Sequence, residues 1–275
     1  MKTIILHRES VYCGPLILVN NQYRYMDHPC GIKCKQESIP LSNLKRITKP
    51  GEEKRQGRNR GVYLLNEAAV QFDKLINSVN GWTGIVPVSG WRSFREQQEI
   101  WDKSVKEQGM AFTKQFVALP GHSEHQTGLA VDVALKSDHI DYICPDFPYE
   151  GICQEFRSHA EKYGFVERYP QAKQQITGIG WEPWHFRYVG VPHAEIMDNN
   201  DLVLEEYIDY LRRYPYGKKE VCMSSGGILY SASYLPAAEE KVSLLVGDNT
   251  NLEISGNNID GWIVTEKQAT DKVML

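Results

Sequence analysis

The length, composition and charge of this chain are those of an ordinary globular protein. Its 275 residues are 41% hydrophobic and 24% charged, with a formal net charge of −4. These values allow one large domain, or a domain with an appendage, and give no general attraction to nucleic acid or to an anionic membrane. No apolar run approaches the roughly 20 residues that a bilayer requires. The apolar run at 4–6 is too short for the core of a signal peptide. We therefore expect a cytoplasmic protein without a membrane span.

Hydrophobic periodicity and turn residues predict mixed helices and strands in chain order. The predicted strands are at 16–19, 85–88, 129–133, 165–169 and 184–189, and the predicted helices at 63–79, 94–108, 153–163, 192–198 and 204–214. Pro87 places its strand at the edge of a sheet or at a bulge, because proline cannot donate to a strand ladder.

The pattern of the sequence changes after Gly217. Short β-prone runs follow at 228–234, 242–246, 252–254 and 262–264, separated by Gly, Asn and Asp. We expect one domain over residues 1–216 and a small β-rich extension over 217–275. Because helices and strands mix without regular βαβ repetition, the sequence predicts an α+β fold. A mostly antiparallel central sheet would be flanked by helices, with a small C-terminal β appendage.

The six cysteines of the chain are predicted to be buried or free thiols, since a cytosolic protein of this size rarely uses a disulfide framework. His28, Cys30 and Cys34 are close in sequence and suggest a second metal site. A fourth ligand is missing, however, and the spacing is irregular.

Two short segments, 123–132 and 182–185, contain the residue types of a catalytic metal site. Asp132 falls inside an apolar predicted strand, where a charge is costly unless it is paired or bound to metal. His125 precedes it, and His185 and Glu182 open another strand. Three N/O ligands with an open fourth position are typical of catalytic zinc, and a nearby non-ligand Glu can act as base. Two imidazoles and a carboxylate suit zinc better than magnesium or calcium.

Each segment by itself is a weak signal, because an isolated His near an apolar strand is more often a hydrogen-bonded structural residue than a ligand. His122 is a rival ligand, a residue that contacts the ligands without binding the metal, or simply an exposed residue. Arg92, at a predicted strand-to-helix turn, can stabilise an oxyanion or grip a carboxylate. It is equally consistent with a surface arginine beside Ser93 as the helix N-cap.

These segments resemble the zinc D,D-peptidases of the VanY, VanX and VanXY group, within the LAS metallopeptidases. The pattern Ser-x-His-x-x-Gly-x-Ala-x-Asp is met by Ser123, His125, Gly128, Ala130 and Asp132. Glu-x-x-His is met by Glu182 and His185, and Ser-Gly-Tyr-Arg-Ser is met by residues 89–93 with Trp91 in place of Tyr. The similarity runs from about residue 10 to 214.

The resemblance implies a role for each matching residue. It implies zinc bound by His125, Asp132 and His185, with Glu182 as catalytic base and acid. Arg92 would lie beside the polarised carbonyl oxygen. Gln97 and Ser123 would hold the substrate backbone or its terminal carboxylate, and Trp184 would shape the pocket wall or serve only in packing.

The implied substrate is a peptide that ends in D-Ala, including peptidoglycan precursors, with cleavage before that residue. The activity would be that of a D,D-carboxypeptidase, a D-Ala-D-Ala dipeptidase or both, and would remove the target of vancomycin. An L,D-carboxypeptidase or cell-wall endopeptidase with the same zinc centre is an alternative. A non-catalytic peptidoglycan-binding module is another, against which Glu182 argues. Nothing in the sequence indicates an oligomeric state.

Overall fold

The structure is a computed structural model of the chain that describes residues 1–26, 39, 41–49, 61–248 and 250–269. The described residues form two compact units. The larger unit lies between residues 19 and 198, and the smaller unit combines residues 1–18 with 199–269.

The larger unit is built on a four-stranded sheet with the order β4-β5-β7-β6, in which every neighbouring pair is antiparallel. Its elements are β2 (Leu44–Ile47), β3 (Val62–Leu65), α1 (Asn66–Ser78), β4 (Ile85–Ser89), α2 (Phe94–Gln108), α3 (Met110–Phe116), β5 (Ala130–Leu135), α4 (Gly151–His159), β6 (Phe165–Tyr169), α5 (Gln174–Thr177), β7 (Glu182–Tyr188) and α6 (Val191–Asn199). Strands β2 and β3 form a separate antiparallel pair.

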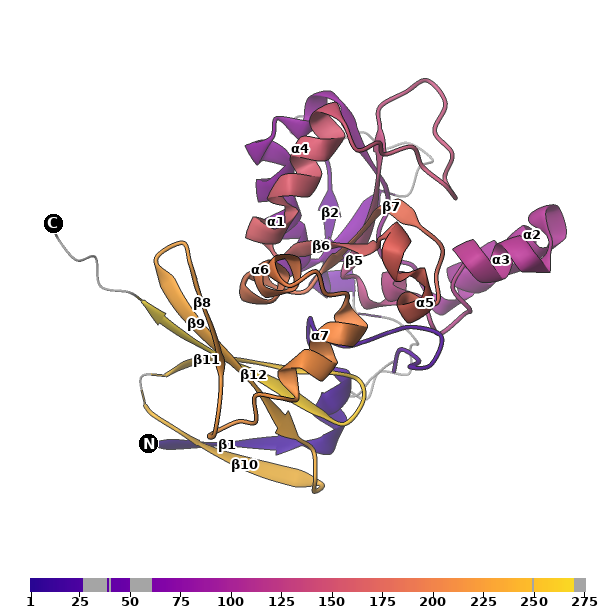
Figure 1. Cartoon of the computed structure of the whole chain (residues 1–275). Helices are drawn as coiled ribbons and strands as arrows, with labels where there is room; N and C mark the ends of the chain where they lie inside the picture. The colour runs from indigo at the N-terminus through magenta and orange to yellow at the C-terminus, as the bar shows by residue number, and fades with distance from the viewer. Residues whose placement is uncertain (27–38, 40, 50–60, 249, 270–275) are drawn as a thin grey trace, which may run out of the picture. The chain divides into compact units, whose positions relative to one another are not determined.

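Helices α1 and α4 pack beside this sheet (Figure 1), and aromatic side chains form much of the core between them. Phe72 of α1 has no exposed surface, and its ring contacts those of Phe156 and Phe165 at centroid distances of 5.9 and 6.2 Å. Phe156 in turn meets Phe186 of β7 edge-on at 5.1 Å. This packing holds β7 against the helices and fixes one face of the sheet.

Local signals in the sequence explain where the elements near the site begin. Ser93 caps α2 in a reciprocal capping box with Glu96, which sets the start of that helix directly after Arg92. Strand β4 is an edge strand, and its register against β5 shifts between Pro87 and Ser89. The predicted edge or bulge at Pro87 is therefore confirmed, since both occur there.

Several predicted bounds were wrong. Residues 16–19 are buried but form no strand, because the amide of Leu18 donates to Asn257 in a loop instead of to a neighbouring strand. The helix predicted from residue 63 begins at Asn66, because the first three residues pair with β2 as part of β3. The predicted strand 165–169 and helix 94–108 match β6 and α2 residue for residue.

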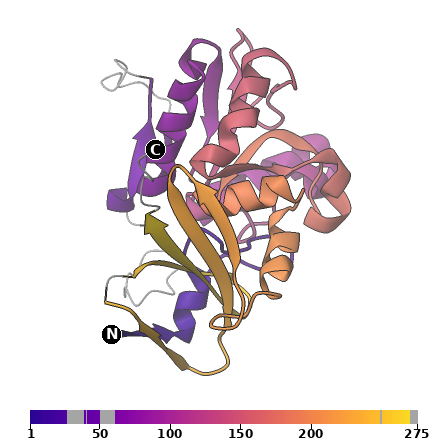
Figure 2. The same ribbon diagram turned by 60° about the vertical axis from the view of Figure 1, so that its left-hand side comes forward.

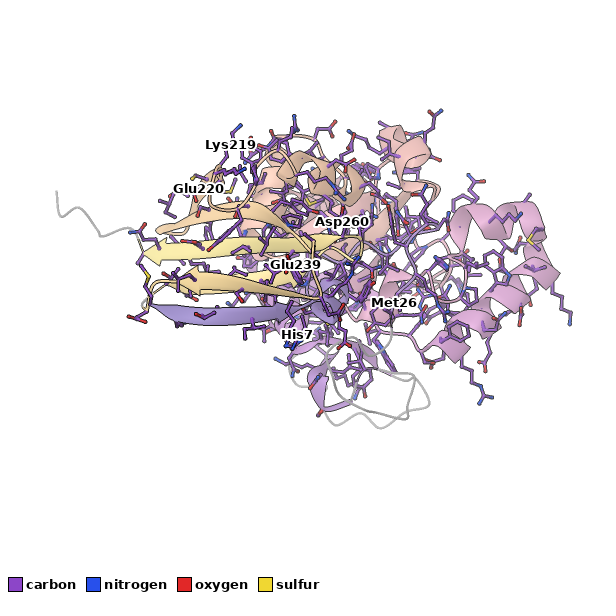
Figure 3. All side chains as sticks on the ribbon, turned by 90° about the horizontal axis from the view of Figure 1, so that it is seen from below. His7, Met26, Lys219, Glu220, Glu239 and Asp260 are labelled. Carbon is purple, nitrogen blue, oxygen red and sulfur yellow. The ribbon has the colours of Figure 1, made fainter. Side chains whose placement is uncertain are left out.

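The described residues of the smaller unit form two antiparallel sheets, one α-helix and a 3-10 helix at Arg8–Tyr12 (Figure 2). Its elements are β1 (Lys2–His7), α7 (Leu204–Leu211), β8 (Val221–Ser225), β9 (Ile228–Pro236), β10 (Lys241–Val246), β11 (Asn251–Gly256) and β12 (Gly261–Ala269). The sheet orders are β1-β10 and β11-β12-β9-β8. Figure 3 shows this strand arrangement from below, with His7 labelled at the end of β1. Trp262 is fully buried in its core and donates from Nε1 to Ser10 at 2.9 Å.

This division differs from the boundary predicted after residue 216. The start of the chain joins the β-rich end because Lys2 to His7 pair along β10. Residues 199–216 also belong there, since the amide of Tyr234 in β9 donates to the carbonyl of Tyr214, and Arg212 pairs with Asp260. The change of composition after residue 216 is visible in the sequence, but these long-range pairings are not.

Cys13 is disulfide-bonded, which corrects the expectation of a thiol at that position, whereas Cys144, Cys153 and Cys222 are free. The cluster of His28, Cys30 and Cys34 lies outside the described residues. Among the described helices, none has the length and apolar character needed to cross a membrane.

Candidate active site

Strands β5 and β7 bring the two predicted segments together. Asp132 lies directly opposite His185 in the antiparallel register, so the two side chains project from one face of the sheet as a cross-strand pair. His125 comes from the short 3-10 helix η4 (Glu124–Thr127), which ends at Gly128 with φ of 69°. Glycine adopts this left-handed conformation without strain, so the chain can turn from η4 into β5.

The three predicted ligands form a compact, buried group. One ligand atom from each of His125, Asp132 and His185 lies within 4.8 Å of the others. Nε2 of His125 is 3.1 Å from one oxygen of Asp132, and Nδ1 of His185 is 2.8 Å from the other oxygen. Nδ1 of His125 donates to the carbonyl of Gly90 at 2.7 Å, which leaves Nε2 for a ligand. This donor set fits a divalent zinc ion.

Charges around the group favour a cation. Burial lowers the pKa of His125 to about 4, and Arg92 adds to this effect, so this imidazole is neutral at pH 7. Burial also opposes a charge on His185, but hydrogen bonds to Asp132 and Glu124 raise its pKa to about 9. The two carboxylates therefore favour a positive charge at His185, which a proton or a metal ion can supply.

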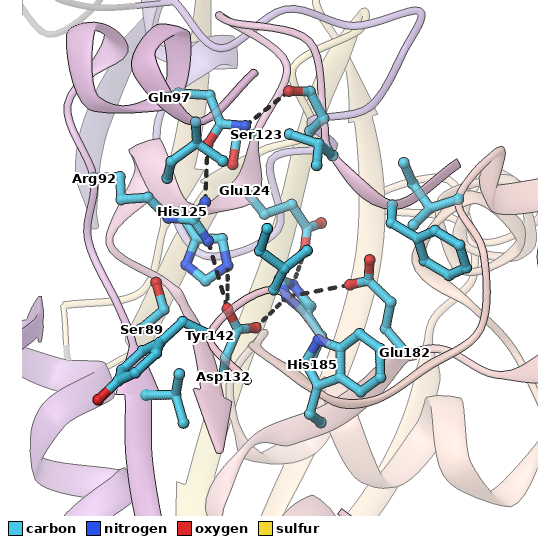
Figure 4. A pocket seen from close by; sticks show the side chains of 18 of the residues that line it. Ser89, Arg92, Gln97, Ser123, Glu124, His125, Asp132, Tyr142, Glu182 and His185 are labelled. Atoms are coloured by element: carbon cyan, nitrogen blue, oxygen red, sulfur yellow. Dashed lines mark hydrogen bonds and ion pairs between the residues drawn. The ribbon is translucent and has the colours of Figure 1, made fainter. Parts of the chain in front are cut away.

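Glu182 is the first residue of β7. Its side chain lies beside His185 but is not part of the ligand group. Its carboxylate oxygen Oε2 lies 3.8 Å from Nδ1 of His185, and Figure 4 shows the two side chains pointing toward each other. Burial raises the pKa of Glu182 to about 8, and His185 opposes this effect. A carboxyl group with a pKa close to neutrality can both accept and return a proton.

Arg92 lies beside Asp132, at the carboxylate oxygen that does not face His185. Its Nη2 is 3.4 Å from Oδ2 of Asp132, and its Nη1 donates to Oε1 of Gln97 at 3.1 Å (Figure 4). The side-chain nitrogen of Gln97 donates to the carbonyl of Ala118 at 2.7 Å. Both polar atoms of Gln97 are thus engaged, and its contact to Arg92 is part of what orients the guanidinium. The surface position that was the alternative for Arg92 is wrong, because the side chain lines the pocket.

One pocket of about 310 Å³ contains all eight predicted site residues, a volume at the small end for ligand sites. Ser123 and Trp184 are buried in its wall, and Tyr142 also lines it. His122 lies elsewhere, since its Nδ1 bonds to the carbonyl of Asn20 at 2.7 Å.

Sequence reasoning missed a buried ionic cluster behind His185. Glu124 pairs with Arg168 and with Arg187, each at 2.8 Å, and all three side chains have no exposed surface. Burial would raise the pKa of Glu124, but the two guanidinium groups hold it well below its usual range. The available signal was a charged residue directly beside a predicted ligand, in a stretch that is otherwise uncharged.

Known proteins share both the sequence and the fold. The VanY family, described as D-alanyl-D-alanine carboxypeptidase, matches residues 61–191. The bifunctional D-Ala-D-Ala dipeptidase and D-Ala-D-Ala carboxypeptidase VanXYC of Enterococcus gallinarum is 50% identical over 151 residues, which cover 54% of this chain and 80% of VanXYC.

Two solved structures extend the comparison. The vancomycin resistance D,D-dipeptidase VanXYg, in complex with a D-Ala-D-Ala phosphinate analog, is 40% identical with a TM-score of 0.86, over 97% of this chain and 99% of that one. A mutant of the vancomycin resistance D,D-pentapeptidase VanY, from a VanB-type resistance cassette and in complex with Zn(II), is 29% identical with a TM-score of 0.53, over 70% of this chain and 98% of that one.

The predicted α+β fold is confirmed by the similarity to VanXYg over nearly the whole chain. The identity to VanXYC, over most of that enzyme's length, likewise confirms that the protein is a peptidase. This chain belongs to the VanY family of D-alanyl-D-alanine carboxypeptidases, as its three motifs predicted.

Proposed function

We propose that this protein is a zinc-dependent D,D-peptidase that hydrolyses peptides ending in D-Ala, including peptidoglycan precursors. It would act as a D,D-carboxypeptidase, a D-Ala-D-Ala dipeptidase or both. The observation that carries this proposal is the buried group of His125, Asp132 and His185, with Glu182 on one side of it and Arg92 on the other.

His125, Asp132 and His185 would hold the zinc ion. When bound, zinc lowers the pKa of a water molecule toward about 7 and polarises the substrate carbonyl. The burial of all three ligands limits competition from solvent. Zinc suits these three residues because it accepts mixed nitrogen and oxygen ligands.

Glu182 would move the proton. As a base it takes a proton from the attacking water, and as an acid it delivers that proton to the nitrogen of the departing D-Ala. The peptide bond breaks, the hydroxyl stays on the carbonyl carbon, and the amine leaves as a neutral group. The raised pKa of Glu182 supports this role, because a carboxyl group with an ordinary pKa would be a poor acid at neutral pH.

Arg92 would stabilise the negative charge that develops on the carbonyl oxygen, since its guanidinium lines the pocket and is oriented by Gln97. Trp184 would shape the pocket wall. The predicted contacts of Gln97 and Ser123 with the substrate backbone or its terminal carboxylate stay predictions. The names of VanXYC and VanXYg support D-Ala-D-Ala as the substrate and a link to vancomycin resistance.

The proposal is tested by measuring released D-alanine from D-Ala-D-Ala, from tripeptides and pentapeptides ending in D-Ala-D-Ala, and from an L,D-linked tetrapeptide. We expect release from D,D-linked substrates that chelation abolishes and zinc restores. Glu182→Gln should lose about 10²–10⁴-fold in kcat while it retains zinc, and Glu155→Gln, an exposed carboxylate on α4, should match the wild type. Cleavage of L,D bonds alone, or full activity of Glu182→Gln, would contradict the proposal.

A further inference from the structure

The imidazole of His185 is held from both sides. Nδ1 faces Asp132, whose Oδ1 lies 2.8 Å away, and Nε2 on the other side of the ring lies 3.4 Å from Oε2 of Glu124. Figure 4 shows His185 between these two carboxylates. Asp132 belongs to the predicted ligand group, whereas Glu124 stands outside it.

Glu124 is itself fixed in place. Its other oxygen, Oε1, accepts hydrogen bonds from Nε of Arg168 and from Nη1 of Arg187, both at 2.8 Å. The three side chains come from η4, β6 and β7, and none of them has exposed surface. Two cations around one carboxylate hold Oε1, so Oε2 points toward the imidazole and cannot rotate away without breaking a buried ion pair.

We propose that Glu124 is a positioning residue that fixes the tautomer and orientation of His185, so that Nε2 carries the proton and Nδ1 presents its lone pair to the metal ion. This inference rests on the proposed zinc function. A carboxylate can only accept, so without metal each ring nitrogen donates to the carboxylate beside it. The proton that a metal ion would displace is the one on Nδ1, because Asp132 belongs to the ligand group, and Glu124 keeps the proton on Nε2. His125 is arranged in the same way with reversed nitrogens, since the carbonyl of Gly90 accepts from Nδ1 and leaves Nε2 for the metal.

A polar partner on the far nitrogen orients most metal-binding histidines, and its loss typically lowers metal affinity or activity about 10–100-fold. Here the partner is fixed unusually firmly, because Arg168 and Arg187 come from adjacent strands and meet at one oxygen atom. The pair offsets the charge of Glu124 and holds its position, so that Oε2 of Glu124 stays beside Nε2 of His185.

Glu124→Gln tests the proposal because the two arginines dictate how the new amide lies. Since guanidinium groups only donate, the amide oxygen should face Arg168 and Arg187, and the amide nitrogen should face His185. The amide would then donate to Nε2 and select the tautomer with a proton on Nδ1, which cannot bind metal. We expect zinc affinity, measured by competition with a chromogenic chelator, to fall about 10–100-fold.

Glu124→Asp is the second variant, because it keeps the negative charge between the arginines but withdraws it from His185 by one methylene. We expect a thermal unfolding midpoint nearer to the wild type than that of Glu124→Gln, with a fall in zinc affinity that persists. Glu155→Gln, which changes an exposed carboxylate on α4, should bind zinc like the wild type.

Nitrogen NMR of the zinc-loaded wild type provides a readout that does not depend on the folding of any variant. With ¹⁵N-labelled histidine, His185 should show a protonated Nε2 and a metal-bound Nδ1. The reverse assignment would overturn the inference, as would wild-type zinc affinity in both Glu124 variants. Absence of zinc binding by the wild type would instead overturn the proposed function, so the two failures are distinguishable.

Discussion

Glu182→Gln should make the zinc-free protein more stable at neutral pH, although it removes the proposed catalytic base. Glu182 is only 7% exposed, and burial raises its pKa from 4.5 to about 8. A folded-state pKa above the unfolded value means that ionisation opposes folding. The cost is absent below pH 4.5, grows as the pH rises, and is complete above about pH 8.

The size of the effect follows from this shift. Each pH unit between the unfolded pKa and the working pH contributes about 1.36 kcal/mol. At pH 7 the interval is about 2.5 units, so ionisation of Glu182 in the unfolded chain, while the folded state keeps it protonated, lowers the free energy of unfolding by up to about 3 kcal/mol. Glutamine carries no such cost. The variant should therefore gain up to about 3 kcal/mol in the free energy of unfolding at pH 7 and almost nothing at pH 4.5.

Urea unfolding in the presence of a chelator, at both pH values, measures this difference. Glu155→Gln is the matched control, since its carboxylate is exposed on α4 and its loss should change little at either pH. A variant no more stable than the wild type at pH 7, or equally stabilised at both pH values, would refute the reasoning. If Glu182→Gln raises the free energy of unfolding as expected, then Glu182 lowers the stability of the protein and is retained for catalysis.

Three further predictions concern the ligands, the pocket and the core. Zinc affinity should rise with pH between about 6 and 9, because His185 must lose the proton that its raised pKa retains before it can bind metal; a flat profile in chelator competition would contradict this. Arg92→Ala should lower kcat about 10²–10³-fold with zinc content unchanged, and loss of the zinc instead would make Arg92 a structural residue of the site. Phe72→Ala should cost about 3–5 kcal/mol of stability in urea unfolding, because its ring is fully buried among other aromatic rings; a cost below 1 kcal/mol would show that the core can collapse around the gap.

The grouping of the three proposed ligands could be predicted because Asp132 is chemically out of place in its local pattern and the two histidines stand in motifs that resemble a known family. Asp132 stands in an apolar strand, and β5 is buried along its first five residues. A buried carboxylate needs a partner, and the two histidines in the neighbouring motifs were the available candidates. Asp132 and His185 meet because they are opposite each other in the register of β5 and β7. The motifs suggest that these segments meet, but they do not reveal this register.

The ionic cluster could not be predicted in the same way. Apolar and polar residues alternate in the predicted strand at 184–189, a pattern that favours one face toward solvent. Every residue of β7 is buried, Arg187 included, because Glu124 lies against the second face. The two residues are 63 positions apart, so no local pattern reveals that the arginine has a buried partner.

The antiparallel pairing of β1 with β10 has a consequence for how the chain is made. Lys2 pairs with Val246, so the first strand must wait until almost the whole chain has been synthesised. At roughly 5–20 residues per second, the intervening 240 or so residues take on the order of 12–50 s. The larger unit, whose described residues end at 198, can leave the ribosome and fold during that time. A catalytic pocket could then be complete while the apolar side chains of β1 still lack their partners, and for that interval they would be open to chaperones, proteases or another unfinished chain.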